Sequence, residues 1–129
     1  MKSHAIAAVA LLASVVNLVA VQSAEPKPLR ALLVTGGCCH DYNTQKAILT
    51  EGLSARANLE WTIVHEGGTS QDHRVSIYEK PDWGANYDVV VHNECFAKID
   101  DESFVKNVAD AHRNGLPCIV IHCTMHTFR

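Results

Sequence analysis

The chain has 129 residues, of which 47% are hydrophobic, and a formal net charge of −3 at pH 7. This length suits one domain rather than two, and the mildly acidic balance argues against nucleic acid as a partner. We expect a small or neutral molecule as the partner, and the sequence leaves the oligomeric state undetermined.

The first 24 residues are typical of a secretory signal peptide. Lys2 precedes an apolar run over 5–21, and small residues around Ser23 and Ala24 offer a cleavage site. A retained membrane anchor is the alternative, although the run is short for a span and Asn17 interrupts it; a plain hydrophobic tail is the third. We therefore expect a secreted or periplasmic protein with a domain over 25–129, and no membrane contact beyond a possible uncleaved signal anchor.

Alternating strand and helix patterns follow. Apolar runs predict strands over 29–34, 59–66, 87–94 and 116–122. A helix is expected near 44–56, capped by Asn43 or Thr44, with Ala47, Ile48 and Leu53 on one face. A second is expected over 101–114, with an apolar stripe at Phe104, Val105, Val108 and Ala111.

These units predict an α/β fold with an open parallel sheet and helices on both faces. Near-continuous apolar strands are typical of sheets that are covered on both sides. Right-handed crossovers then favour the flavodoxin-like strand order 2-1-3-4. The last strand has no following helix, so we expect the chain to be the N-terminal part of a larger domain, incomplete at its C-terminus.

Polar and ionisable side chains that could bind a ligand or take part in catalysis gather where three of these strands end. Ligands of open parallel sheets bind at that edge. Four of the eight histidines lie there. The residues expected at this edge are Thr35, His40, Asp41, His92, Asn93, Glu94, Cys95, His122, Cys123, Thr124 and His126.

The glycine pair Gly36-Gly37 ends the first strand. It resembles a phosphate-binding turn, but it lacks the GxGxxG and GK[ST] patterns, so a sharp turn with close backbone approach is the favoured interpretation. No nucleotide motif is present, and the cofactor is left unknown.

The histidines allow three interpretations. His122 and His126 are four residues apart and, with Glu94, could bind a divalent metal. Acid–base or hydrogen-bonding roles toward a substrate are favoured instead, and purely structural roles are the third possibility. The prediction therefore includes no metal ligand.

Cys123 is the sharpest single candidate, because a strand that runs into a cysteine and then a helix resembles a nucleophile elbow. Ile121 and Met125 occupy positions where elbows have small residues, so a buried or substrate-lining thiol is favoured over a nucleophile. Five cysteines leave at least one thiol unpaired in an exported chain, and adjacent Cys38 and Cys39 are not expected to bond each other.

The segment 66–86 is long for a connection in a compact domain. Ile77, Tyr78 and Trp83 favour packing, whereas Asp72, His73 and Arg74 are polar candidates. A lid over the strand ends and a covering insertion without ligand contact are equally compatible with this composition.

Four segments in order resemble the ThuA-like (trehalose-utilisation) family: RALLVTGGCCHDYNTQKAILTEGL, EWTIVHEGG, YDVVVHNECF and GLPCIVIHCTMHTFR. The resemblance covers about residues 29–129 and implies a class I glutamine amidotransferase-like fold. It places Cys123 at the amidotransferase cysteine, although the surrounding G-x-C-x-G pattern is absent. It also implies a role in the use of trehalose or a related disaccharide or keto-sugar.

We expect the sugar to bind at the carboxyl ends of the strands, with a non-catalytic binding or interaction module as the alternative. His122, Glu94 and Cys123 are the predicted catalytic residues, with His122 as general acid–base beside the Glu94 carboxylate. The predicted substrate-binding residues are His40, Asp41, Asn93, Thr124 and His126.

Overall fold

A computed structural model describes residues 25–128. The predicted signal peptide, residues 1–24, lies outside the described residues. Between residues 25 and 128, the helices are too short or too polar to cross a membrane.

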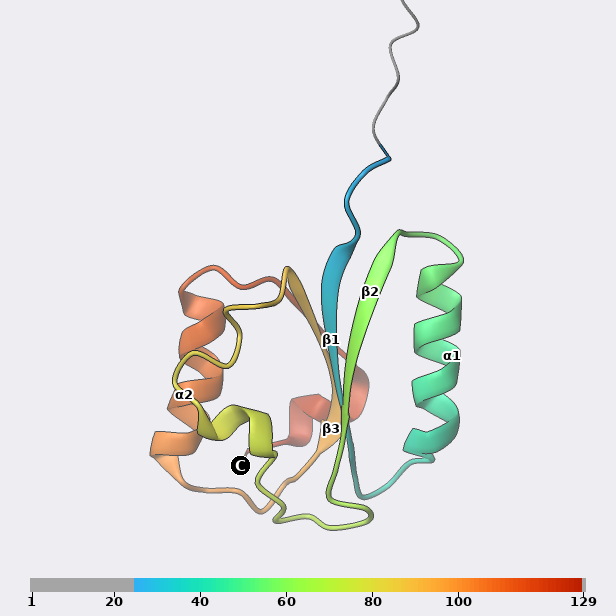
Figure 1. Cartoon of the computed structure of the whole chain (residues 1–129). Coiled ribbons are helices and arrows are strands. Elements are labelled where there is room, and N and C mark those ends of the chain that lie inside the picture. Colours follow the sequence, from blue (N-terminus) through green and yellow to red (C-terminus); the bar gives the residue numbers. More distant parts are fainter. Residues whose placement is uncertain (1–24, 129) are drawn as a thin grey trace, which may run out of the picture.

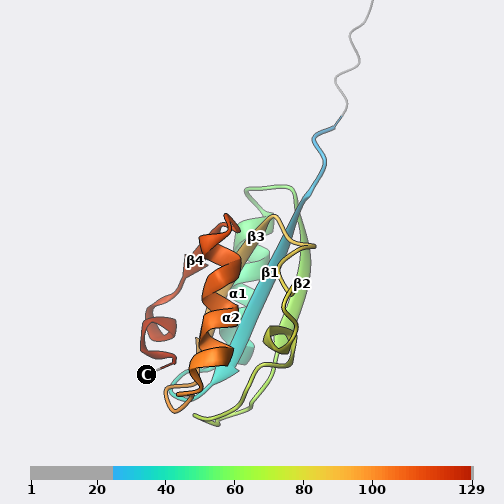
Figure 2. The ribbon, with the colours of Figure 1, turned by 90° about the vertical axis from the view of Figure 1, so that its left-hand side faces the viewer.

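The predicted sheet is confirmed. Strands β1 (Leu29–Gly37), β2 (Leu59–His65), β3 (Val89–Cys95) and β4 (Cys118–Val120) are all parallel, in the order β2-β1-β3-β4. Helix α1 (Tyr42–Ser54) covers one face, and helix α2 (Glu102–Arg113) lies over the other (Figure 1; Figure 2).

The ends of two strands differ from the prediction. β1 continues to Gly37 because the glycine pair still pairs with Glu94 and Cys95 of β3. β4 is shorter than predicted, and Ile121 leads into a 3₁₀ helix, η2 (His122–His126). His122 therefore lies in η2 rather than at the end of a strand.

The predicted N-cap of the first helix was wrong, and the apolar face of that helix is largely exposed. Asp41, rather than Asn43 or Thr44, is the N-cap, and its carboxylate accepts hydrogen bonds from the backbone N–H and hydroxyl of Thr44. Ile48 is 63% exposed. The reason is that α1 packs on β1 and β2, whereas Ile48 borders a hollow that it shares with Asn93 and Ile121.

The predicted stripe of α2 is confirmed and forms one wall of the core. Phe104 and Val108 are buried, and Val105 and Ala111 pack against them. Asp101 caps the helix by accepting bonds from the backbone N–H groups of Ser103 and Phe104.

The segment 66–86 completes that core. Its 3₁₀ helix η1 (Ser76–Glu79) buries Tyr78, and Val75 and Trp83 are buried on either side of it. Asn107 of α2 donates to the carbonyls of Tyr78 and Lys80. The packing interpretation of this segment is therefore supported by direct contacts with α2.

Arg30 and Asp88 predict an acid-dependent part of the stability. The Arg30 guanidinium forms two hydrogen bonds with Asp88 and lowers the pKa of that carboxyl from 3.8 to about 2. Because the pKa of Asp88 is lower in the folded than in the unfolded state, the ionised carboxylate stabilises the fold above pH 3.8. This contribution to the stability disappears as the pH falls toward 2. When the pH is lowered between these two values, the Asp88→Asn variant should therefore lose less stability than the parent chain. Thermal melts recorded across that pH range measure the difference. Equal losses in the two proteins would contradict the prediction.

The outer edge of β4 predicts self-association. Ile119 and Val120 are about half exposed, at 49% and 48%, on a strand whose outer edge is unpaired among the described residues. Exposed apolar edge strands favour pairing between chains, and a lysine on the edge opposes it. Ile119→Lys should reduce concentration-dependent association in sedimentation velocity without lowering the unfolding midpoint. Unchanged association would locate the contact elsewhere.

Candidate functional site

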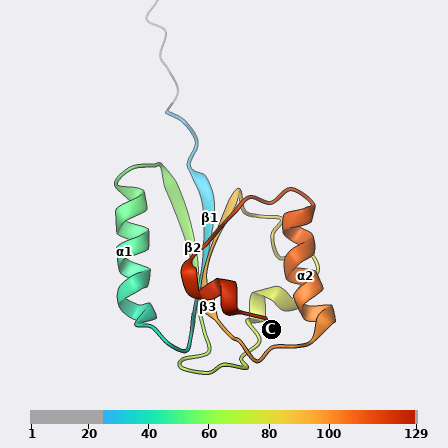
Figure 3. The same ribbon diagram turned by 180° about the vertical axis from the view of Figure 1, so that it is seen from behind.

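The carboxyl ends of β1 and β3 meet where the strand order reverses. β1 leads toward α1 and β3 leads toward α2, so the two connections diverge and leave a crevice. η2 lies beside this edge (Figure 3), and Ile121 donates its backbone N–H to the carbonyl of His92. The predicted edge therefore exists, with η2 as its outer wall.

The glycine pair makes close approach possible at this edge. Gly36 and Gly37 have φ values of 136° and 95°, which favour glycine, and a Cβ on them would overlap the carbonyl oxygens of Glu66 and Cys95. This geometry supports the turn interpretation of the pair.

Cys38 and Cys39 correct a prediction. They form a disulfide between adjacent residues, with Cys39 at φ 86°, although adjacent cysteines were not expected to bond. Cys38 Sγ lies 3.8 Å from Cys95 Sγ, and the Tyr42 hydroxyl donates to the Cys38 carbonyl. Burial of Tyr42 raises the pKa of its phenol, which keeps it a donor. The tight turn therefore holds the following residue, His40, in a defined position.

His40, His122 and Cys123 form what we call the strand-end cluster. His40 Nε2 lies 2.7 Å from Cys123 Sγ, although the two residues are 83 positions apart. One ligand atom from each of the three residues lies within 4.8 Å of the others. Such a group can exchange protons between imidazole and thiol, and its donor set also suits a zinc-type ion.

Other predicted residues lie near this cluster in different roles. The His126 ring lies edge-on to His122, 6.1 Å away. Thr124 accepts a hydrogen bond from the backbone N–H of Glu94 and so ties η2 to β3. Asp41 is the cap of α1, as described above. Thr124 and Asp41 therefore both stabilise the fold, Thr124 by joining η2 to β3 and Asp41 by capping α1.

Asn93 is buried and faces α1. Its side-chain amide donates to Thr35 Oγ1 and Gln45 Oε1. A cavity of about 190 Å³ adjoins it, lined by Gln45, Ile48, Leu49, Asn93 and Ile121. This cavity lies between α1 and the residue that leads from β4 into η2.

Glu94 points to the opposite face, toward α2. It is fully buried, and its Oε1 accepts from the Tyr78 hydroxyl at 3.0 Å and lies 2.9 Å from His92 Nδ1. His92 Nε2 in turn lies 2.9 Å from His112 Nε2. The structure therefore brings Glu94 together with His92 and Tyr78, and the hydrogen bonds and ion pairs between residues 25 and 128 include none that joins Glu94 to His122.

Neither the contact of Tyr78 with Glu94 nor that of His112 with His92 was predicted from the sequence. Burial and the nearby Glu94 charge raise the pKa of Tyr78, so the phenol stays protonated, and burial lowers the pKa of His112. One signal was available: His92 and Glu94 are two apart on a strand and must share a face. No comparable feature of the sequence indicated that His112 of α2 would lie against His92.

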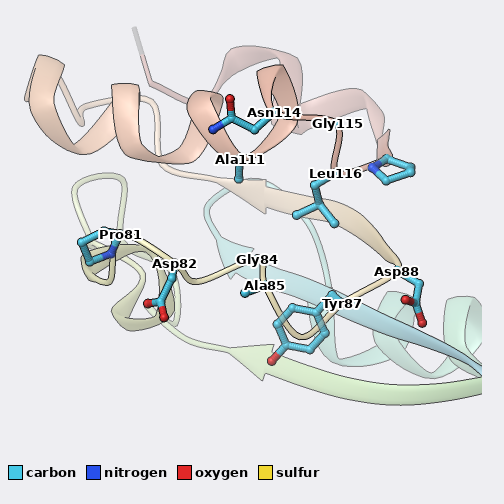
Figure 4. A pocket seen from close by; sticks show the side chains of 11 residues that line it. Pro81, Asp82, Gly84, Ala85, Tyr87, Asp88, Ala111, Asn114, Gly115 and Leu116 are labelled. Carbon is cyan, nitrogen blue, oxygen red and sulfur yellow. The ribbon is translucent and has the colours of Figure 1, made fainter.

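Another cavity lies at the other end of the sheet. About 530 Å³ in volume, it is bounded by the C-terminal end of α2 and by the segment before β3 (Figure 4). Leu116 lies close to Gly84, where a Cβ would overlap the leucine side chain. None of the predicted site residues lines this cavity, so its size does not mark the strand-end edge.

Comparisons of the chain with models of known families, with curated proteins and with solved structures find no significant match.

The buried contacts of Glu94 generate a stability prediction. Tyr78→Phe removes the hydroxyl that donates to a fully buried carboxylate, whose Oε2 already has no hydrogen bond among the described residues. Loss of a partner at a buried charged group should lower the free energy of unfolding by about 1–3 kcal/mol. Chemical denaturation measures the change, and Tyr87→Phe is the matched control, expected within about 0.5 kcal/mol of the parent. Equal effects of the two substitutions would contradict this account of Glu94.

Proposed function

We propose that the protein is an exported, ThuA-like carbohydrate-utilisation protein that binds trehalose or a related disaccharide or keto-sugar at the carboxyl ends of its strands. The observation that carries the proposal is the strand-end cluster, in which His40 and Cys123 meet at the point where the strand order reverses. Ligands of open parallel sheets bind at such a point.

The donors and acceptors of the edge suit a polyhydroxyl ligand. Three imidazoles, those of His40, His122 and His126, are exposed there, and each can donate or accept a hydrogen bond. Neutral sugars need many such groups and no strong charge. The mildly acidic chain is compatible with that class of ligand.

In this proposal His122 is the general acid–base, because it is exposed to a ligand and lies within the cluster. His40 holds the Cys123 thiol through the 2.7 Å contact. Glu94 is buried below the edge, so it supports β3 and η2 rather than touching the ligand.

A second candidate is a non-catalytic binding module on the same scaffold. The observation that favours it is that Asp41, Asn93 and Thr124 are already engaged in hydrogen bonds within the fold. Binding without turnover would require only the exposed imidazoles of the edge.

Substitution of His122 tests the catalytic proposal. In the protein, His122→Asn should lower turnover of trehalose or its keto derivative about 10²- to 10⁴-fold, because a general acid–base is lost, while the melting temperature is preserved. His65→Asn, at the end of β2 and outside the cluster, is the matched control and should retain activity. An active His122→Asn variant would overturn the assignment.

Cys123→Ser separates the two roles of the thiol. A serine hydroxyl can still hydrogen-bond to His40, so a lining residue tolerates the change and activity should persist. Loss of activity, together with labelling of Cys123 by a thiol reagent, would instead establish a nucleophile. Sugar binding without turnover in the parent protein, measured by calorimetry, would favour the binding module.

A further inference from the structure

A second group of two histidines and a cysteine lies on the α2 side of the sheet, apart from the strand-end cluster. We call His92, His112 and Cys118 the α2-face cluster. They come from β3, α2 and β4, and one ligand atom of each lies within 4.8 Å of the others. His92 is buried, His112 is partly buried and Cys118 is exposed. The proposed carbohydrate function uses none of these three residues.

The two imidazoles face each other through the same type of nitrogen. His112 Nδ1 lies 2.8 Å from the carbonyl of Leu116, which can only accept, so Nδ1 carries the proton. His92 Nδ1 lies 2.9 Å from the buried Glu94 carboxylate, which likewise favours a proton on that nitrogen. With both Nδ1 atoms protonated, two Nε2 lone pairs point at one another across 2.9 Å. A cation between them removes that repulsion.

This arrangement matches the supports of metal-binding histidines. Such histidines donate their second ring N–H to a carboxylate or a backbone carbonyl, which fixes the ring and raises its basicity. Here Glu94 serves His92 and the Leu116 carbonyl serves His112. Trp83 packs edge-on to both rings, at centroid distances of 6.4 and 5.6 Å, and forms an apolar wall beside them.

The dimensions also suit a tetrahedral ion. Zinc–nitrogen bonds of about 2.0–2.1 Å place two ligand nitrogens about 3.4 Å apart. The observed 2.9 Å separation reaches that value by shifts of a few tenths of an ångström in the two rings. Cys118 supplies a third, thiolate ligand from the exposed side, which leaves the fourth position open to water.

We propose that His92, His112 and Cys118 bind a zinc ion that joins β3, α2 and β4. The ion would accept both Nε2 lone pairs that face each other across 2.9 Å. It also fixes the short strand β4, whose side chains are exposed and which pairs with β3 over three residues. The site is independent of the strand-end sugar site, so either can exist without the other.

Cobalt titration of the full 129-residue chain under anaerobic conditions tests the proposal. One equivalent of Co²⁺ should give tetrahedral absorption bands and a thiolate-to-cobalt charge-transfer band, and Zn²⁺ should displace it. Zn²⁺ should also raise the melting temperature, because it binds the folded state. Absence of cobalt absorption in the parent chain would overturn the proposal.

Matched cysteine variants assign the site. Cys118→Ser should abolish the charge-transfer band, whereas Cys123→Ser, which alters the strand-end cluster, should retain it. His112→Gln provides a second variant and should likewise lose the tetrahedral bands, with circular dichroism as the check on folding. A band that survives Cys118→Ser, or that disappears only in Cys123→Ser, would overturn the proposal and assign the ion to other residues.

The support from Glu94 provides a further readout. Glu94→Gln keeps a side chain of similar size but removes the charge that orients His92. Loss of such a supporting partner should weaken zinc binding about 10- to 100-fold, measured by competition with a chelator. An unchanged zinc affinity would contradict the proposed arrangement, whatever the result for sugar turnover.

Discussion

The parallel pairing of β1 with β3 is the interaction on which both candidate sites depend. Its register sets Thr35 opposite Asn93 and the glycine pair opposite Glu94 and Cys95. The glycines let the chain turn beside the end of β3, and the turn then presents His40 to η2. Residues 83 positions apart in the sequence, His40 and Cys123, meet because this register and the Thr124 bond to β3 fix both sides of the edge.

The alternation of side chains along β3 separates the two sites. His92 and Glu94 point toward α2 and η1, whereas Asn93 points toward α1 and contacts Gln45. A shift of one residue in the strand register would exchange these faces and place the carboxylate against α1. One face of β3 therefore carries the buried polar network of His92 and Glu94. The other face carries Asn93, which lies beside α1.

The polar network beneath the edge is unusual for a core built from apolar side chains. Glu94 is fully buried beside Tyr78, and a buried carboxylate is costly unless hydrogen bonds or a positive charge compensate it. The Tyr78 hydroxyl and His92 Nδ1 both lie within hydrogen-bond distance of Glu94 Oε1, and the zinc ion that we propose would add a positive charge beyond His92. Groups of this kind, with ionisable residues held in apolar surroundings, are found more often at functional positions than elsewhere.

The sequence by itself determined the fold class, the strand order and the face of α2 that is buried, because apolar periodicity and the handedness of crossovers are local properties. It also indicated the strand-end edge, since parallel strands must end together. Only the tertiary structure decided which side chains contact one another. Ile48 is exposed because of how α1 sits on the sheet, Cys38 and Cys39 are bonded because the turn is tight, and Glu94 pairs with His92 rather than His122. Those outcomes depend on contacts between distant segments, such as the approach of His112 on α2 to β3, that no local pattern encodes.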